Sequence, residues 1–153
     1  MRPNSIRLGR RHQYWFYTTF GVLFFSGLLW LIFRHYLRVQ GEFGETARPA
    51  EPWFLKAHGA AAMASLVLLG TLVPGHIRRG WNARRNRATG SSFIALNGLL
   101  ILSGYALYYF AGENSRAWIS AAHWVIGLAF PFFLVWHIWQ GRRLRQAKRA
   151  SHP

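Results

Sequence analysis

The sequence contains no cysteine, and this absence excludes several kinds of redox site. Without cysteine the chain cannot form disulfides, hold an iron–sulfur cluster through thiolates, or carry a covalently attached c-type haem. A redox cofactor on this chain would need other ligands. The seven histidines are the obvious candidates.

Acidic residues are almost as scarce, with four glutamates and no aspartate against 19 lysines and arginines. The long apolar stretches contain no carboxylate at all. The chain therefore has no carboxylate for a proton relay within them, which argues against proton-coupled quinol oxidation by this chain alone. No glycine-rich nucleotide loop and no Ser/His/Asp set is recognisable either, so soluble enzyme chemistry has no visible location.

Hydrophobic residues, by contrast, make up 52% of the 153 residues and are concentrated in four blocks. These blocks are residues 14–33, 54–73, 93–110 and 119–139. A hydrocarbon core of about 30 Å needs roughly 20 helical residues, so each block is long enough to cross a membrane. The sequence predicts an all-α integral membrane four-helix bundle, with helices at about 14–35, 53–76, 92–111 and 118–140.

The distribution of charge predicts the orientation of these helices. Fourteen of the 19 cations lie before the first block, between the second and third, and after the fourth, and these segments contain no acid. Because cationic short loops stay in the cytoplasm, both termini are expected inside and the glutamate-bearing loops outside. We expect a multi-pass protein of the bacterial inner membrane, with a basic cytoplasmic N-terminus (1–13), a transmembrane domain (14–141) and a basic cytoplasmic tail (142–153).

The same distribution of charge indicates which partners the cations serve. Cations divided among the short flanks of membrane spans are explained by orientation and by membrane lipid, so the net charge of +15 does not indicate nucleic-acid binding. The N-terminal block is longer than a signal-peptide core and lacks a small-residue cleavage site, and we expect it to stay as the first span.

Two histidines are expected at matching depth near the outer surface. His58 follows Trp53 by five residues and His123 follows Trp118 by five, and both tryptophans are suited to the membrane interface. Because the second and fourth helices run in the same direction, His58 and His123 are predicted to face each other a turn or two below the surface.

Two further histidines repeat this arrangement near the inner surface. His137 follows His123 by 14 residues and His76 follows His58 by 18, and both separations are close to whole numbers of helical turns. Facing stripes would form two stacked sites, His58 with His123 and His76 with His137. His76 has a second interpretation, because the segment VPGHIRRG is also suited to a chain that is leaving the membrane.

Paired imidazoles at equal depth on two helices are what bis-histidine haem b requires. Small residues near the histidines would leave room for the macrocycle: Gly59, Ala60, Ala61, Ala62, Gly98, Gly104 and Gly127. Haem propionates need cations at the interface, and Arg34 outside and Arg78 inside are candidates. For His12, His35 and His152 we expect only a hydrogen bond to a neighbouring helix or contact with water.

Four segments carry a resemblance to a known group: HGAAAMASLVLLG, RRGWNARRNRATG, LSGYALYYFAGE and HWVIGLAFPFFLVWHIWQGRR. They resemble the small bacterial four-helix membrane cytochromes of the flavinylation-associated type, distant relatives of cytochrome b561 and of the cytochrome b subunits of formate dehydrogenase and hydrogenase. The resemblance runs from Trp53 to Arg143, and the first helix matches only in type. The separation of His58 and His76 departs from the shorter spacing usual in that group. The resemblance implies haem b and electron transfer between quinol and an extracytoplasmic partner.

We therefore expect an electron-transfer subunit of an oxidoreductase complex rather than a stand-alone enzyme. It would hold one or two haems b, with a quinone as a further candidate ligand and a membrane or periplasmic redox protein as partner. Two alternatives remain open. One is a non-redox assembly subunit with hydrogen-bonded histidines, and the other is a carrier of metal ions that uses the histidines as transient ligands.

Overall fold

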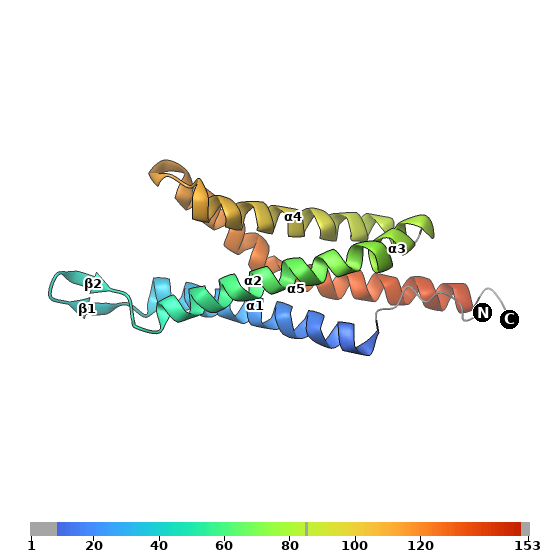
Figure 1. Ribbon diagram of the computed structural model, residues 1–153, viewed down its shortest axis with the longest axis horizontal. Helices are drawn as coiled ribbons and strands as arrows, with labels where there is room; N and C mark the ends of the chain where they lie inside the picture. The colour runs from blue at the N-terminus through green and yellow to red at the C-terminus, as the bar shows by residue number, and fades with distance from the viewer. Residues whose placement is uncertain (1–8, 85, 151–153) are drawn as a thin grey trace. The chain divides into compact units, whose positions relative to one another are not determined.

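The computed structural model describes residues 9–84 and 86–150, and within them the chain is mostly helical (Figure 1). Its contacts divide it into two compact units, the first ending at His76 and the second beginning at Ile77. Each unit contains one pair of long helices packed against each other. The predicted all-α class is thus confirmed for the described residues.

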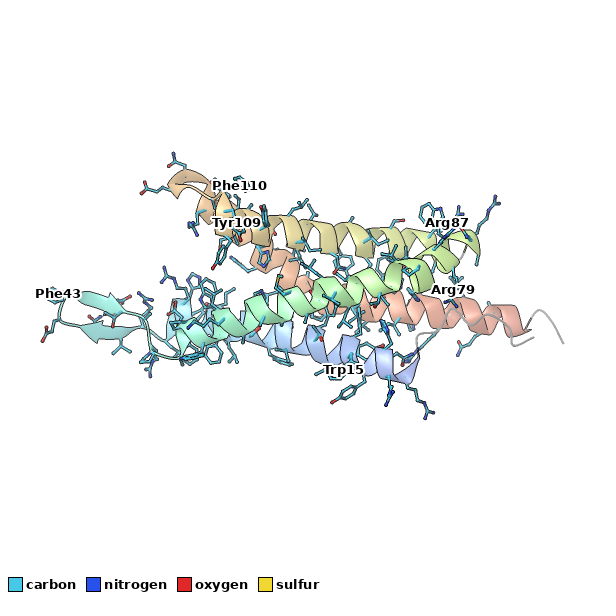
Figure 2. The ribbon with its side chains drawn as sticks, in the orientation of Figure 1. Trp15, Phe43, Arg79, Arg87, Tyr109 and Phe110 are labelled. Carbon is cyan, nitrogen blue, oxygen red and sulfur yellow. The ribbon has the colours of Figure 1, made fainter. Side chains whose placement is uncertain are left out.

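The first unit pairs α1 (Arg10–Tyr36) with α2 (Glu51–Leu72). A small antiparallel hairpin, β1 (Val39–Gly41) and β2 (Gly44–Thr46), connects them and extends beyond the helix ends in Figure 1. Gly44 has φ +109°, a value that L-residues rarely adopt, and this allows the tight turn. Phe43 lies at the hairpin tip and is fully exposed (Figure 2). The sequence did not predict this hairpin.

The interface between α1 and α2 follows helical spacing. Phe16 and Phe20, one turn apart on α1, are buried with their rings 4.4 Å apart. On α2 the buried positions include Ala61 and Ser65, also one turn apart. His58 precedes Ala61 by three residues, which places it on the face of α2 that contacts α1.

The regular part of the second span is shorter than predicted. α2 ends at Leu72, and a π-helical segment, η1 (Val73–Ile77), follows it. Pro74 has no N–H and cannot make the i→i−4 hydrogen bond of an α-helix, which explains a break at this point. His76 lies inside η1, so the α-helical period assumed between His58 and His76 does not extend to it.

A buried carboxylate lies at one end of the first unit and pairs with two arginines. Glu51 is 6% exposed at the start of α2, and its oxygens lie 3.7 Å from Arg34 and 3.4 Å from Arg38. Arg38 also donates to the carbonyl of Glu45 in β2, and Arg48 donates to the carbonyl of Leu37. These bonds tie the β-hairpin to the helix ends.

We expect Glu51→Ala to lower the free energy of unfolding by about 1–3 kcal/mol. This is below the 3–5 kcal/mol for breaking a fully buried pair, because the arginine partners are partly exposed. Thermal unfolding in detergent, followed by circular dichroism, measures the change. Glu42→Ala, in the exposed turn, is the matched control and should be nearly neutral. Equal effects of the two variants would show that the ion pairs contribute nothing.

The second unit consists of α3 (Arg78–Asn82), α4 (Arg87–Tyr109) and α5 (Glu113–Ala150). The predicted third helix began at 92 and the predicted fourth covered 118–140, so both predictions were too short. Residues 142–150, expected as a tail, continue α5. Arginine, lysine, glutamine and alanine favour helix even where the apolar run has ended. Residues 1–8 and 151–153, the ends of the predicted tails, lie outside the described residues.

The contacts between α4 and α5 also follow one face of each helix. The Phe93 and Phe130 rings are 4.9 Å apart, and Gly127 lies opposite Leu100. His123, Phe130 and His137 are spaced by seven residues along α5, and all three contact α4. The prediction that His123 and His137 share a helix face is therefore confirmed, even with Pro131 between them.

Four helical segments of the described chain are long and apolar enough to cross a membrane. They are Arg10–Tyr36, Glu51–Asn82, Arg87–Tyr109 and Glu113–Leu144, and little of their apolar length is buried within the protein. Large apolar side chains such as Trp15 and Phe132 are instead mostly exposed (Figure 2). An apolar surface of this extent needs lipid or another protein around it.

Candidate functional site

His58 of α2 is held against α1 by a hydrogen bond to the backbone. Its Nδ1 lies 2.8 Å from the carbonyl oxygen of Leu23. Ser26, one turn later, donates to the same carbonyl at 3.1 Å and lies 3.4 Å from Nδ1. Because a carbonyl only accepts, Nδ1 of His58 must carry the hydrogen.

A glycine makes this close approach possible. A Cβ atom at Gly27 would lie 2.9 Å from both Cε1 and Nδ1 of His58, which is shorter than real Cβ contacts. Only glycine leaves the ring its present position. The pair Ser26–Gly27 therefore forms the seat of the His58 imidazole on α1.

His123 of α5 has an equivalent seat on α4. Its Nδ1 is 2.8 Å from Oγ of Ser103, and a Cβ at Gly104 would lie 3.3 Å from its Cε1. Ser103 donates its hydroxyl hydrogen to the carbonyl of Leu99 at 2.6 Å. With the hydroxyl hydrogen donated to Leu99, the Ser103 oxygen has a lone pair for an N–H on Nδ1 of His123.

His137 is held by the first turn of α4. Its Nδ1 lies 3.2 Å from Oγ1 of Thr89 and 3.4 Å from Nδ2 of Asn86, and Thr89 donates to Oδ1 of Asn86 at 2.5 Å. Nδ2 of Asn86 donates to the carbonyl of His137 at 3.3 Å. The Phe93 ring stacks on the imidazole with centroids 5.6 Å apart.

The bond to the Leu23 carbonyl determines the tautomer of His58. With the hydrogen on Nδ1, a neutral imidazole has its lone pair on Nε2. Histidines that bind metals usually donate their other ring N–H to a carbonyl or polar side chain, which fixes ring orientation and raises ligand basicity. His58 has this arrangement, and His123 and His137 each place Nδ1 against a hydroxyl group of α4.

His12 bonds through its other ring nitrogen. Its Nε2 lies 3.1 Å from Oγ1 of Thr71 on α2, which donates to the carbonyl of Leu68 at 2.6 Å. The expected hydrogen bond of His12 to a neighbouring helix is thus present. His35 is exposed at the end of α1, and His152 lies outside the described residues.

Sequence reasoning missed the serine–glycine pairs, although a signal was present. The dipeptide Ser-Gly occurs twice in the sequence, and each copy faces a histidine of the next long helix in the same unit. Gly104 had been predicted only as space for a cofactor. Gly59 and Gly98, predicted for the same purpose, have no atom within 4 Å of an added Cβ, apart from their own helix backbone and chain neighbours.

The remaining predicted site residues lie near helix ends or in the π-helical segment. His76 is half-buried in η1, and Arg78 is exposed as the first residue of α3. Arg34, predicted to meet a propionate, pairs with Glu51. The two members of each predicted histidine pair belong to different units, so the pairings remain predictions.

The described part of the chain offers no larger ligand set of the usual kind. Among the residues that the structure describes, no group of three or more His, Cys, Asp or Glu side chains is gathered as for a metal ion. A site with two axial histidines does not require such a group, because the porphyrin supplies the other four ligands.

No protein-family model matches the chain, and no curated protein or solved structure is significantly similar to it.

Proposed function

We propose that this chain is a membrane-bound b-type cytochrome subunit that carries electrons between a quinone pool and a redox partner outside the cytoplasm. His58 and His123 would ligate one haem, and His137 with His76 a second. The proposal goes beyond the fold, which shows only four helices able to span a membrane.

The observation that carries the proposal is the shared orientation of three histidines. Each lies on a long apolar helix and has its Nδ1 within hydrogen-bond distance of an oxygen of the neighbouring helix: Leu23 O, Ser103 Oγ and Thr89 Oγ1. Nε2 would be the ring nitrogen that ligates the iron. The equal sequence spacing of His58 after Trp53 and of His123 after Trp118 supports their pairing.

The residues fit the group in size and chemistry. Neutral imidazoles are the axial ligands that haem b takes, and two of them leave no coordination position open for oxygen. When bound, such a haem supplies reversible one-electron transfer. The chain would contribute ring orientation through Ser26–Gly27, Ser103–Gly104 and Thr89, and an apolar surrounding that limits access of water.

The charges support the proposed location. The basic segments flank three helix ends, and positive charge near a span favours the cytoplasmic side. The glutamates of the other two loops would then face the periplasm of a bacterial inner membrane. A redox protein docking there would meet Glu42, Glu45 and Glu113, all exposed.

The test is the dithionite-reduced minus oxidised visible spectrum of the detergent-purified chain, with haem quantified per chain. We expect a sharp low-spin b-type spectrum and two haems. One haem would leave His58 and His123 as the site and make His76 an interfacial residue. A folded chain without haem, from cells well supplied with it, would overturn the proposal. The hydrogen bonds of the histidines would then serve an assembly subunit, or a metal carrier if zinc or copper binds.

A further inference from the structure

Two arginine–tryptophan pairs lie at one end of the second unit. The guanidinium of Arg87 stacks on Trp81, 4.8 Å from the ring centroid, and that of Arg143 stacks on Trp139 at 3.9 Å. The tryptophans are 52% and 47% exposed, and both arginines are exposed. An arginine stacked on an aromatic ring keeps its charge and presents its N–H edge sideways.

Contacts between α4 and α5 place both pairs at the same end. Asn86, which precedes Arg87, donates to the carbonyl of His137 and lies against Gly141. Trp139 lies between His137 and Gly141 on α5, so it is at the same end of the unit as Arg87. Figure 2 shows Arg87 at the start of α4, at the opposite end of that helix from Tyr109 and Phe110.

Arg87 is also oriented by the backbone. Its Nε and Nη2 donate to the carbonyl oxygen of Trp81 at 3.1 and 2.8 Å, which uses two of the five guanidinium N–H donors. Arg87 begins one candidate membrane span, and Arg143 is one residue from the end of another. Both pairs therefore lie where an apolar segment gives way to polar sequence.

No carboxylate balances this end of the unit. Between Ile77 and Pro153 the sequence has one acid, Glu113, at the opposite end of α4 and α5. The described helices here carry further cations on α3 and α5, such as Arg78 and Arg142. A surface with half-exposed tryptophans, stacked guanidinium groups and uncompensated positive charge is complementary to an anionic headgroup above acyl chains.

We propose that the pairs Trp81–Arg87 and Trp139–Arg143 form a binding site for an anionic phospholipid. The tryptophan rings contact the upper acyl region, and the two guanidinium groups bind the phosphate. The inference goes beyond haem binding and depends only on the helices lying in a membrane.

Native mass spectrometry of the full chain, with phosphatidylglycerol and phosphatidylcholine of identical acyl chains, tests the site. We expect preferential binding of phosphatidylglycerol, weakened about fivefold by each of Arg87→Gln and Arg143→Gln. Arg87→Lys with Arg143→Lys keeps the charge but loses the stacked planar groups, and should bind with intermediate affinity. Arg116→Gln is the matched control, because Arg116 lies at the other end of the unit and donates to carbonyls of the turn.

Equal binding of the two lipids by the unaltered chain would overturn the inference. So would a loss of phosphatidylglycerol binding in Arg116→Gln as large as that in Arg87→Gln or Arg143→Gln. Unchanged phosphatidylglycerol binding in the double lysine variant would do the same. Displacement of the lipid by inorganic phosphate at equal concentration would also contradict a lipid site. Haem content, measured on the same variants, separates this test from that of the proposed function, since it should not change.

Discussion

Replacing His58 with alanine is expected to lower the haem content of the purified chain by one haem, and His123→Ala should do the same. Under the proposed pairing, each variant would remove one of two axial ligands from the same iron, and the remaining single bond would not retain the group. Pyridine haemochrome quantification per chain measures the loss. Circular dichroism on the same samples shows whether the helices remain folded.

The double variant tests the pairing, which the two separate units leave open. If His58 and His123 bind one haem, His58→Ala with His123→Ala loses no more haem than either single change. Residues that act as a unit are non-additive in this way. A further haem lost in the double variant would show that the two histidines serve different sites.

His35→Ala supplies the control for this experiment. His35 is exposed at the end of α1, and its removal should leave the haem content and the spectrum unchanged. A loss of haem equal to that of His58→Ala would mean that the substitutions act through the general stability of the chain. In that case the loss of haem would not identify His58 as an axial ligand.

The apolar blocks predicted the number and order of the spans because helix formation in a membrane depends mainly on length and hydropathy. The helix ends were less predictable. α4 begins at Arg87, five residues before the predicted start, because helical structure continues through a polar segment. The hydroxyls of Ser91 and Ser92 bond to carbonyls four residues earlier, so these polar groups are satisfied within the helix itself.

The seats of the histidines could not be predicted from spacing alone. Periodicity placed His123 and His137 on one face correctly, but it could not say which neighbour that face meets. The structure shows that the face meets α4, where Ser103 and Thr89 hydrogen-bond to the two histidines. Such contacts depend on how two helices are rotated against each other, and hydropathy contains no information on that rotation.

His76 shows a different limit of sequence reasoning. The prediction counted five regular turns from His58, whereas Pro74 interrupts the α-helix and the segment becomes π-helical. The wider turn shifts the residues that follow around the helix axis. The regular α-helical period that placed His76 on the stripe of His58 therefore does not apply to it.

Gly27→Ala is expected to displace the His58 ring and to lower both stability and haem content. The added methyl group would lie 2.9 Å from Cε1 and Nδ1 of His58, so the ring must move away from Leu23 or the two helices must separate. Overpacking of this kind costs about 1–3 kcal/mol. Thermal unfolding in detergent measures the stability, and the reduced visible spectrum measures the haem that remains.

Two other glycines complete this experiment, because they differ in the space around them. Gly104→Ala places the methyl group 3.3 Å from Cε1 of His123 and should have a smaller effect. Gly21→Ala, on the same helix as Gly27, meets nothing within 4 Å and should be neutral or slightly stabilising, since alanine favours helix over glycine by about 0.5–1 kcal/mol. The expected order of damage is Gly27, Gly104, Gly21. Equal effects of Gly27→Ala and Gly21→Ala would show that Ser26–Gly27 does not position His58. If Gly27→Ala lowers stability but leaves the haem content unchanged, the pair serves helix packing and not ligation.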